Sequence, residues 1–512
     1  MANPRRGHPV TVIATSQSAT RRRKLPLSQI IVVFLFVTIL ICAISIQTIM
    51  RSIKMAGQPE VDLITPQSLS KSNQQVTVVD SKEPVVIAHA ISLIKCSKSA
   101  SVTGFLDAAA VLRHSIHKNS IHAKRNEGNR SRYSYQMYAI VHPSCAPHSA
   151  PLIKLGYRLL VKDHPVKKED IKGEWLRNHI EGENCCGSAE FIKLYAYHIT
   201  KHPIVVHWDM DVAVLQPLDD LYDAMLYPST HPIGQAARNR IEKQHPEDPW
   251  PETVDAFVTR DITSAKPWEK VTAVQGGFLV ARPDKAVFDK YIEFIKEGNY
   301  THNPARGDGS GWSGLGYGGF QGAMAYQGVV AYYYDILRPN TAVELNVCRW
   351  NQVGADVIWR GPEHMEHHLQ CRDFPRTTLA DGQPDYASNT LCEDCRNTPI
   401  EFVKTIHYTA CKKPWECKMA YPRNPRDKRQ KYRLENLVNV TMCMDLVREW
   451  FELRKEFEDE LLTSSGGKAK LAERNGAFES QYFLGYCSGE GNYVPMKPPP
   501  NDFDINSMYG IW

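Results

Sequence analysis

The sequence predicts an α/β protein with a mainly parallel sheet covered by helices on both faces, preceded by one transmembrane helix. Runs rich in β-branched residues alternate with segments of helical periodicity between residues 85 and 208. A charge-free stretch of 21 residues lies near the N-terminus. The chain has 512 residues, of which 43% are hydrophobic, so it has enough apolar material for one large domain or two smaller ones. This composition excludes a disordered protein.

A basic tail occupies residues 1–29. It carries six arginines and lysines and no acidic residue before position 25, whereas the whole chain has a formal net charge of +5. Without those six side chains the net charge is −1, so the basic character belongs to the tail alone. The main body therefore has no electrostatic feature that favours nucleic-acid binding.

Residues 30–50 are long and apolar enough to cross a bilayer as a helix. No cleavage site of small residues follows them, which favours an uncleaved signal anchor over a signal peptide. Four consecutive cations, Arg21 to Lys24, precede the stretch, and a weaker pair follows it. The positive-inside rule then places the N-terminus in the cytosol and residues 51–512 on the other side of a membrane.

The cysteines agree with this topology. One of the thirteen, Cys42, lies in the predicted span, and the other twelve are an even number in an oxidising compartment, which favours disulfides. Cys392 and Cys395 have the spacing of half a zinc site, but no second pair accompanies them. Three sequons for N-glycosylation follow the span, at Asn129, Asn299 and Asn439.

Residues 51–84 are polar and read as a luminal stem, and a domain follows over residues 85–425. The β-branched runs at 85–94, 137–141, 157–161 and 204–208 predict strands, and the runs at 105–116, 152–157 and 189–199 predict helices. This alternation predicts a mainly parallel sheet with helices on both faces. Residues 426–512 contain an amphipathic helix at about 446–462 and a proline-rich end, for which the sequence indicates no function.

The segment Ile204-Val-Val-His-Trp-Asp-Met-Asp carries the strongest local signal for chemistry. Its strand delivers Asp209 and Asp211 to the carboxyl end, where ligands bind in open α/β sheets. Residues two apart share a strand face, so both carboxylates are expected to reach one cation. Two hard oxygen ligands suit Mn²⁺ or Mg²⁺ bridging to substrate phosphates. A haloacid-dehalogenase-like phosphatase is the competing interpretation, but Ala213 stands where those enzymes usually have Thr or Val.

A second motif lies about 200 residues downstream, where His407, Lys413, Pro414 and Trp415 form H-x-x-A-x-x-K-P-W. This resembles the H-x-x-G-x-x-K-P-W signature of the glycogenin-like glycosyltransferases, family eight of the carbohydrate-active enzymes. Further segments, over residues 85–420 and in the family's order, resemble its other motifs: Asp209-Met-Asp211, Leu218-Asp-Asp-Leu-Tyr222, Phe191-Ile-Lys-Leu194, Gln275-Gly-Gly-Phe278 and Gly319-Phe-Gln-Gly322.

The resemblance implies a GT-A fold and a retaining transfer of a sugar from a nucleotide-sugar. Asp209, Asp211 and His407 would hold the metal, and Mn²⁺ suits an imidazole ligand better than Mg²⁺ does. Gln321 would lie beneath the anomeric carbon as a stabilising catalytic group. The residues implied to bind the nucleotide-sugar are Lys193, Asp209, Met210, Gly276, Gly277 and Lys413.

The chain departs from the family's pattern at several positions. Ala410 replaces the glycine of the histidine motif, and Gln275-Gly276 replaces an Asn-Ser pair. Phe320 replaces an aspartate often placed near the transferred sugar. These changes leave the metal and diphosphate site in place and bear on the identity of the sugar.

The expected function is therefore a metal-dependent, single-pass type II glycosyltransferase of the Golgi or another secretory-pathway membrane. It would move a hexose or pentose from a UDP-sugar to a glycan or glycoprotein. Two alternatives are a membrane-tethered carbohydrate-binding protein that has lost turnover, for which Phe320 is the motivation, and a luminal phosphatase.

Overall fold

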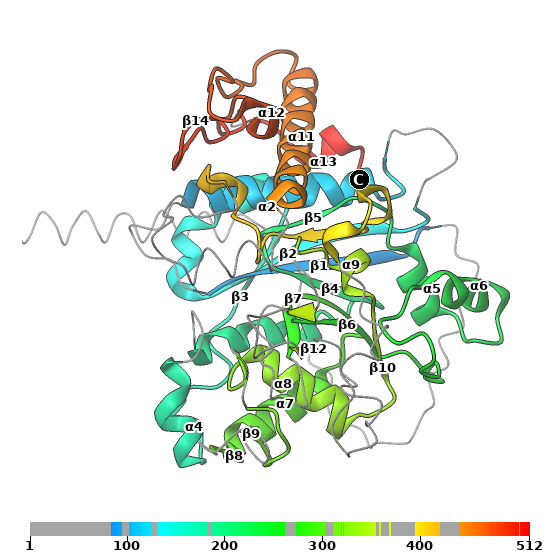
Figure 1. Cartoon of the computed structure of the whole chain (residues 1–512). Coiled ribbons are helices and arrows are strands. Elements are labelled where there is room, and N and C mark those ends of the chain that lie inside the picture. The colour runs from blue at the N-terminus through cyan, green and yellow to red at the C-terminus, as the bar shows by residue number, and fades with distance from the viewer. Residues whose placement is uncertain are drawn as a thin grey trace, which may run out of the picture. The chain divides into compact units, whose positions relative to one another are not determined.

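The structure is a computed structural model, and its described residues all belong to one compact unit, Val76–Trp512 (Figure 1). The described residues are 83–94, 102–123, 131–182, 187–261, 273–302, 311–318, 320, 322–354, 358–359, 368–369, 395–419, 440–500 and 502–511. The predicted tail, anchor and stem lie outside them, apart from the last two stem residues. Among the described residues, no helix combines the length and the apolar character that crossing a bilayer requires.

A seven-stranded sheet in the order β10-β6-β7-β4-β1-β2-β3 forms the centre of the molecule. Six strands run in one direction, and β7 alone is antiparallel to both of its neighbours. The predicted mainly parallel sheet is confirmed. The strands are β1 (Val86–Leu93), β2 (Ser134–Val141), β3 (Arg158–Val161), β4 (Val205–Trp208), β6 (Ala256–Arg260), β7 (Val274–Ala281) and β10 (Ala342–Glu344).

The order of strands creates a switch point between β1 and β4. From β1 the chain winds outward through β2 and β3, and it then returns to the other side of β1 to form β4. Ligands of such sheets bind at the carboxyl ends of the strands beside the switch point, because the two loops diverge there and leave a crevice. Residues 209–211, which follow β4, therefore lie where this topology favours a site.

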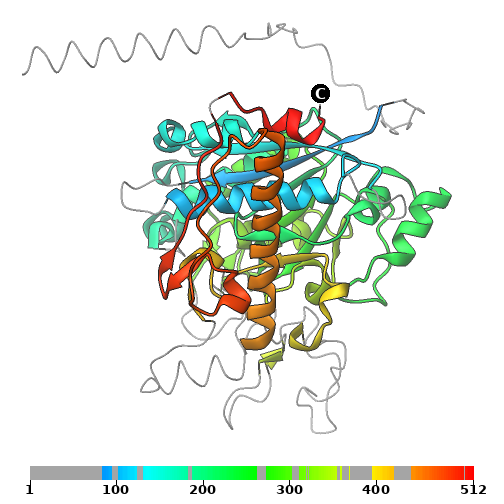
Figure 2. The same ribbon diagram turned by 90° about the horizontal axis from the view of Figure 1, so that it is seen from above.

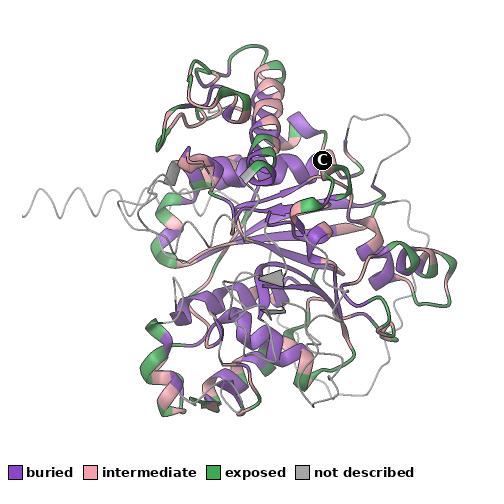
Figure 3. Cartoon of the chain, in the orientation of Figure 1, coloured by how far each residue is buried: buried purple, intermediate pink, exposed green. Residues whose placement is uncertain are grey.

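The two faces of the sheet bury different clusters of side chains, as expected for strands covered on both sides. On β1, Ile87 and Ile91 belong to one cluster, and Ala88 and Ala90 belong to the other. Figure 3 shows the resulting buried strands between two helical layers. The small alanines allow the 3₁₀ segment η4 (Gly187–His198), where an α-helix was expected, to pack on the second face.

The first face is covered by α2 (Val102–Lys118), α3 (Ala150–Lys154), α5 (Asp219–Leu226), α6 (Pro232–Arg240) and α13 (Ile505–Tyr509). The second face is covered by α4 (Glu174–His179), η4, α7 (Lys285–Glu297) and α8 (Tyr326–Tyr332). Asp284 caps the N-terminus of α7, where its side chain accepts a hydrogen bond from Ala286 N, and Gly298, with a φ of 68°, caps the C-terminus. Both ends are thus capped in the usual way.

Helix α11 (Val440–Ser464) lies across α2 on the first face, with the C-terminal chain beside it (Figure 2). A third buried cluster joins α11 to the segments that follow β10. The C-terminal residues therefore pack as part of the domain. The smaller elements are β5 (Val212–Val214), β8 (Tyr300–Thr301), β9 (Gly311–Trp312), α9 (Val347–Trp350), β11 (Ile358–Trp359), β12 (His368–Leu369), β13 (Thr405–His407), α12 (Ser480–Phe483), β14 (Cys487–Gly489) and β15 (Asn492–Tyr493).

Candidate active site

The loop after β4 carries the two aspartates. Asp209 N donates to Gly277 O of β7 at 3.0 Å, which prolongs the ladder between these strands by one residue. The chain then turns at Met210 and continues into β5. Strand β5 pairs with β13 so that Val212 lies opposite His407, and Tyr408 N donates to Asp211 O at 2.9 Å. This pairing is what brings the distant histidine to the aspartates.

Asp209, Asp211 and His407 each offer one ligand atom, and these atoms lie within 4.8 Å of one another. His407 Nε2 lies 3.5 Å from Asp211 Oδ2. An ion that keeps about 2.0–2.6 Å from each ligand can span such separations. Among the described residues, this is the one group of three or more histidine, cysteine or acidic side chains with the geometry of a metal site.

Gly277 leaves room for this cluster. A methyl group at position 277 would lie 2.5 Å from His407 Cε1 and 2.9 Å from Asp209 Oδ2. His407 Nδ1 is buried and has no hydrogen-bond partner in the part of the chain that the structure describes. Two carboxylates, a buried imidazole and a glycine that prevents steric overlap fit a divalent cation. Mixed oxygen and nitrogen ligands suit Mn²⁺.

The His407 imidazole is prepared for a metal. Its side chain is 2% exposed, and burial lowers its pKa below the ordinary value of 6.5. A ligating histidine must be neutral, so this shift reduces the competition between proton and metal. Burial likewise lowers the pKa of His207 to about 3, and this neutral ring bonds to Ser92 Oγ at 2.9 Å.

Each aspartate has its own lysine. Lys193 Nζ on η4 donates to Asp209 Oδ1 at 2.9 Å and to Gly276 O at 3.3 Å. Burial opposes the charge of Lys193, but the carboxylates of Asp209 and Glu190 together outweigh it and raise the pKa of the lysine. Burial would raise the pKa of Asp209, but the charge of Lys193 and its hydrogen bond are the main influence that lowers that pKa, to about 2. Both groups are charged at neutral pH.

Lys413 Nζ donates to Asp211 Oδ2, so the second carboxylate is also paired. The two carboxylates and two ammonium groups balance in charge. A bound divalent cation would add positive charge beside these four groups, which favours an anionic ligand such as a diphosphate. The lysine side chain remains 34% exposed, so it can turn toward a ligand outside the cluster.

Of the other site residues expected from the sequence, the structure describes Met210 and Gly276. Met210 packs against the first core cluster, which gives its side chain a structural contact. Gly276 lies on β7, where a methyl group would be 3.0 Å from Gln327 Cγ. Gln321 lies outside the described residues. Phe320 is buried in the second core cluster, where its ring takes no part in a polar site.

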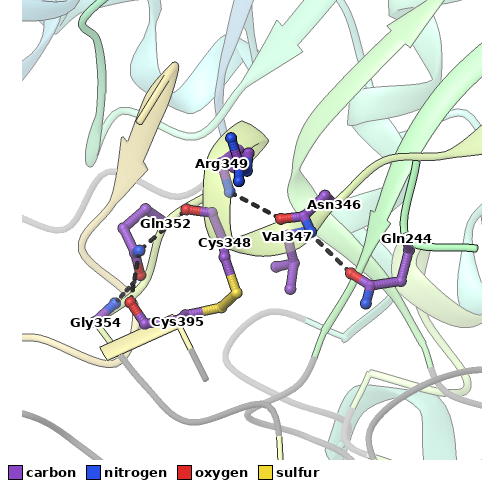
Figure 4. Close-up of a disulfide and its surroundings, with 8 residues drawn as sticks. All are labelled: Gln244, Asn346, Val347, Cys348, Arg349, Gln352, Gly354 and Cys395. Carbon is purple, nitrogen blue, oxygen red and sulfur yellow. Dashed lines mark hydrogen bonds between the residues drawn. A yellow bond between two sulfur atoms is a disulfide. The ribbon is translucent and has the colours of Figure 1, made fainter. Parts of the chain in front are cut away.

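Gln352, which hydrogen-bonds to the edge of β13, was not identified from the sequence. Gln352 is fully buried and its Nε2 donates to Cys348 O at 3.0 Å and to Cys395 O at 2.9 Å (Figure 4). The Cys348–Cys395 disulfide joins the same two residues. His407 N in turn donates to Gln352 O at 2.9 Å. A single glutamine in sequence carries no signal for this role.

Disulfides were expected over a zinc site, and the described cysteines support that choice. Cys395 pairs with Cys348, and two more disulfides join Cys411 to Cys443 and Cys417 to Cys487. Cys392 lies outside the described residues. Trp415 of the histidine motif has a packing role: it lies over Gly104, and the centre of its ring is 6.3 Å from that of Phe105 and 5.9 Å from that of Trp450.

No family model matches the chain, and no curated protein matches it. Three solved structures to which it is similar are described as glycosyltransferases. The bifunctional glycosyltransferase WbbM has a TM-score of 0.32 at 12% identity, over 74% of this chain and 52% of that one. Mouse xyloside xylosyltransferase 1 has a TM-score of 0.32 at 10% sequence identity, and the match covers 63% of this chain and 98% of that one. The galactosyltransferase LgtC, in complex with donor and acceptor sugar analogs, has a TM-score of 0.34 at 12% sequence identity. This match covers 73% of this chain and 96% of that one.

The chain thus spans about half of WbbM and nearly all of the other two. At these low TM-scores the similarity says nothing about the chemistry of this chain. The function proposed next rests on the geometry of the site and on the sequence motifs.

Proposed function

We propose that this protein is a metal-dependent glycosyltransferase that uses a nucleotide-sugar, and that it belongs with the GT-A enzymes. The observation that carries the proposal is the convergence of Asp209, Asp211 and His407 within 4.8 Å at the carboxyl end of β4. Lys193 and Lys413 flank this group. That combination matches the needs of a reaction in which a diphosphate leaves.

The departure of the nucleoside diphosphate requires stabilisation of its developing negative charge. A divalent cation held by Asp209, Asp211 and His407 would supply Lewis-acid stabilisation of that charge. Lys413 is the exposed cation of the site and would contact the diphosphate as a point charge. Lys193 is buried against Asp209 and Gly276, so its role is to hold the charged carboxylate in position.

The finer assignments follow from the resemblance to the glycogenin-like family. They are retention of the anomeric configuration, a UDP-hexose or UDP-pentose donor, and Gln321 as the stabilising group beneath the anomeric carbon. Gly276 and Gly277 would border the diphosphate and sugar, and the position of Gly277 against His407 and Asp209 places it beside the proposed metal ligands. Met210 stays a proposed donor contact through its backbone, because its partly buried side chain packs against the core.

We also propose that residues 30–50 anchor the protein in a Golgi or other secretory-pathway membrane, with the stem 51–84 and the domain in the lumen. The acceptor is then a glycan or glycoprotein. The three disulfides among the described residues support an oxidising compartment. We further propose that residues 85–425 form the catalytic domain and that residues 426–512 are a separate C-terminal region of the sequence.

The deciding experiment is UDP release from a panel of UDP-sugars by the full-length protein in detergent, with Mn²⁺, with Mg²⁺ and with EDTA. We expect release that depends on the metal and is greatest with Mn²⁺. Tight UDP-sugar binding without release would indicate the carbohydrate-binding alternative. Phosphate release from an aryl phosphate without UDP-sugar turnover would indicate the phosphatase. Either result contradicts the transferase.

A further inference from the structure

The segment that carries His407 and Lys413 is tied to the C-terminal region on both sides of the lysine. Cys411, two residues before Lys413, is joined to Cys443 on α11. Cys417, four residues after it, is joined to Cys487 on β14. Lys413 therefore lies in a short stretch whose two ends are covalently fixed to residues 440–487.

Non-covalent contacts reinforce the two disulfides. Tyr408 Oη, one residue after the metal-site histidine, donates to Leu446 O of α11 at 2.6 Å and is fully buried. Gly491 N, in the turn between β14 and β15, donates to Glu416 O at 3.1 Å. Cys417 itself has a φ of 49°, a left-handed conformation that costs a non-glycine residue free energy unless its surroundings enforce it.

The C-terminal region is in turn fixed to α2 by a buried ionic network. Arg454 of α11 is fully buried, 3.7 Å from Asp107 of α2 and 3.5 Å from Glu458. Tyr493 Oη donates to Asp107 Oδ2 at 2.5 Å, and Tyr486 Oη donates to Glu458 at 2.6 Å. A buried charge is strongly destabilised when its partner is lost, so this network holds the region in one position.

We propose that residues 440–496 are a positioning element of the active site, which fixes Lys413 and His407 against the sheet through the disulfides Cys411–Cys443 and Cys417–Cys487. The role assigned to Lys413 rests on the proposed function. A site that binds a metal and a diphosphate needs its side chains held within about 0.5 Å, and a loop does not provide this alone. The disulfides reduce the entropy that the loop would lose on binding.

The test is a double variant, Cys417→Ala with Cys487→Ala, in the full-length protein in detergent. We measure hydrogen exchange of residues 405–418, the affinity for Mn²⁺ and, with Mn²⁺, the affinity for UDP. We expect faster exchange in 405–418 with unchanged exchange in β1 and β4. We also expect both affinities to fall by about 10-fold or more, as when groups that orient a metal site are removed.

Ile295→Val, on the buried side of α7 on the other face of the sheet, is the control for a general loss of stability. It is expected to leave exchange in 405–418 and both affinities unchanged. Wild-type exchange and affinities in the double variant would overturn the proposal. So would an equal loss of affinity in the Ile295→Val protein at the same decrease in melting temperature.

Tyr408→Phe provides a milder variant that decides the question if the double variant does not fold. It removes only the hydrogen bond to Leu446 O. We expect about fivefold weaker UDP binding and faster exchange around residue 408, and no change in either would overturn the proposal. If the wild type binds neither Mn²⁺ nor UDP, the proposed function fails, while the exchange data still decide whether residues 440–496 position the segment.

Discussion

His407 Nε2 lies 3.5 Å from Asp211 Oδ2, although almost two hundred residues separate them in the chain. The pairing of β5 with β13 sets this distance, because it places His407 opposite the residue that follows Asp211. A shift of one residue in that pairing would turn the imidazole to the other face of the ribbon. The buried Gln352, which accepts a hydrogen bond from His407 N, and the Cys348–Cys395 disulfide stabilise this register of β13.

Asp211→Asn should remove one metal ligand and leave the fold intact, because the amide keeps the size of the side chain. We expect Mn²⁺ affinity to fall by about 100-fold or more, beyond what loss of a supporting group costs, and metal-dependent UDP binding to disappear. Calorimetric titration measures both. Asp220→Asn, on the surface of α5 in a pair with Arg240, is the matched control. Unchanged binding by Asp211→Asn would reject this ligand assignment.

Gly277→Ala should disturb the site by volume alone. The added methyl group would lie 2.5 Å from His407 Cε1, so the imidazole must move away from Asp209 and Asp211. We expect about 10–100-fold weaker Mn²⁺ binding with circular dichroism unchanged. A methyl group at Gly182 would meet no atom of the described residues within 4 Å, so Gly182→Ala serves as the control. If both alanine variants bind Mn²⁺ alike, Gly277 does not border the metal.

Lys193→Met should make stability depend on the metal. Without the lysine, the partly buried Asp209 carboxylate stays charged but has lost its ion-pair partner. Breaking a fully buried pair costs about 3–5 kcal/mol, but Asp209 is 33% exposed, so we expect about 1–2 kcal/mol. Bound Mn²⁺ should restore part of this loss.

Thermal unfolding in EDTA and in Mn²⁺ measures the effect of Lys193→Met. The rise in melting temperature on adding Mn²⁺ should be larger in the variant than in the wild type. Lys285→Met, from an exposed pair with Asp289, should change neither value. An equal rise in the variant and the wild type would contradict the idea that lysine and metal share the carboxylate.

Stability should fall in mild acid through His89 of β1. Burial lowers the pKa of His89 from 6.5 to about 3, and its Nδ1 accepts from Trp208 Nε1 at 3.0 Å. Above pH 6.5 the ring is neutral in both states. Between pH 6.5 and 3 the unfolded chain binds a proton that the folded one does not. The free energy of unfolding therefore decreases with falling pH by about 1.4 kcal/mol per unit from this group.

Denaturant unfolding at pH 6.5, 5.5 and 4.5 tests this contribution. His89→Gln keeps an acceptor for Trp208 but has no titrating group, so its stability should decline less steeply. His179→Gln, at an exposed position on α4, should decline as the wild type does. Equal slopes for the wild type and His89→Gln would refute the assignment.

Local sequence patterns were enough to predict the central strands and the position of the candidate site. The β-branched runs of residues 85–94 and 204–208 predict two central strands, because short strands buried on both faces are rich in consecutive β-branched and other apolar residues. The position of Asp209 and Asp211 directly after such a strand locates the site. The resemblance of the histidine motif to the glycogenin-like signature indicates which distant segment accompanies it. The strands and the aspartate pair are inferred from neighbours in sequence, whose spacing fixes their relation in space.

Only the tertiary structure decided which groups meet. It gave β7 its antiparallel direction, paired Lys193 with Asp209 and left no room for a side chain at Gly277. It also joined the C-terminal region, which had no assigned role in sequence, to the segment around Lys413. These relations depend on packing and disulfide pairing between segments far apart in the chain. No local pattern encodes them, because the free energy of each contact exists only once the sheet and its helices have come together.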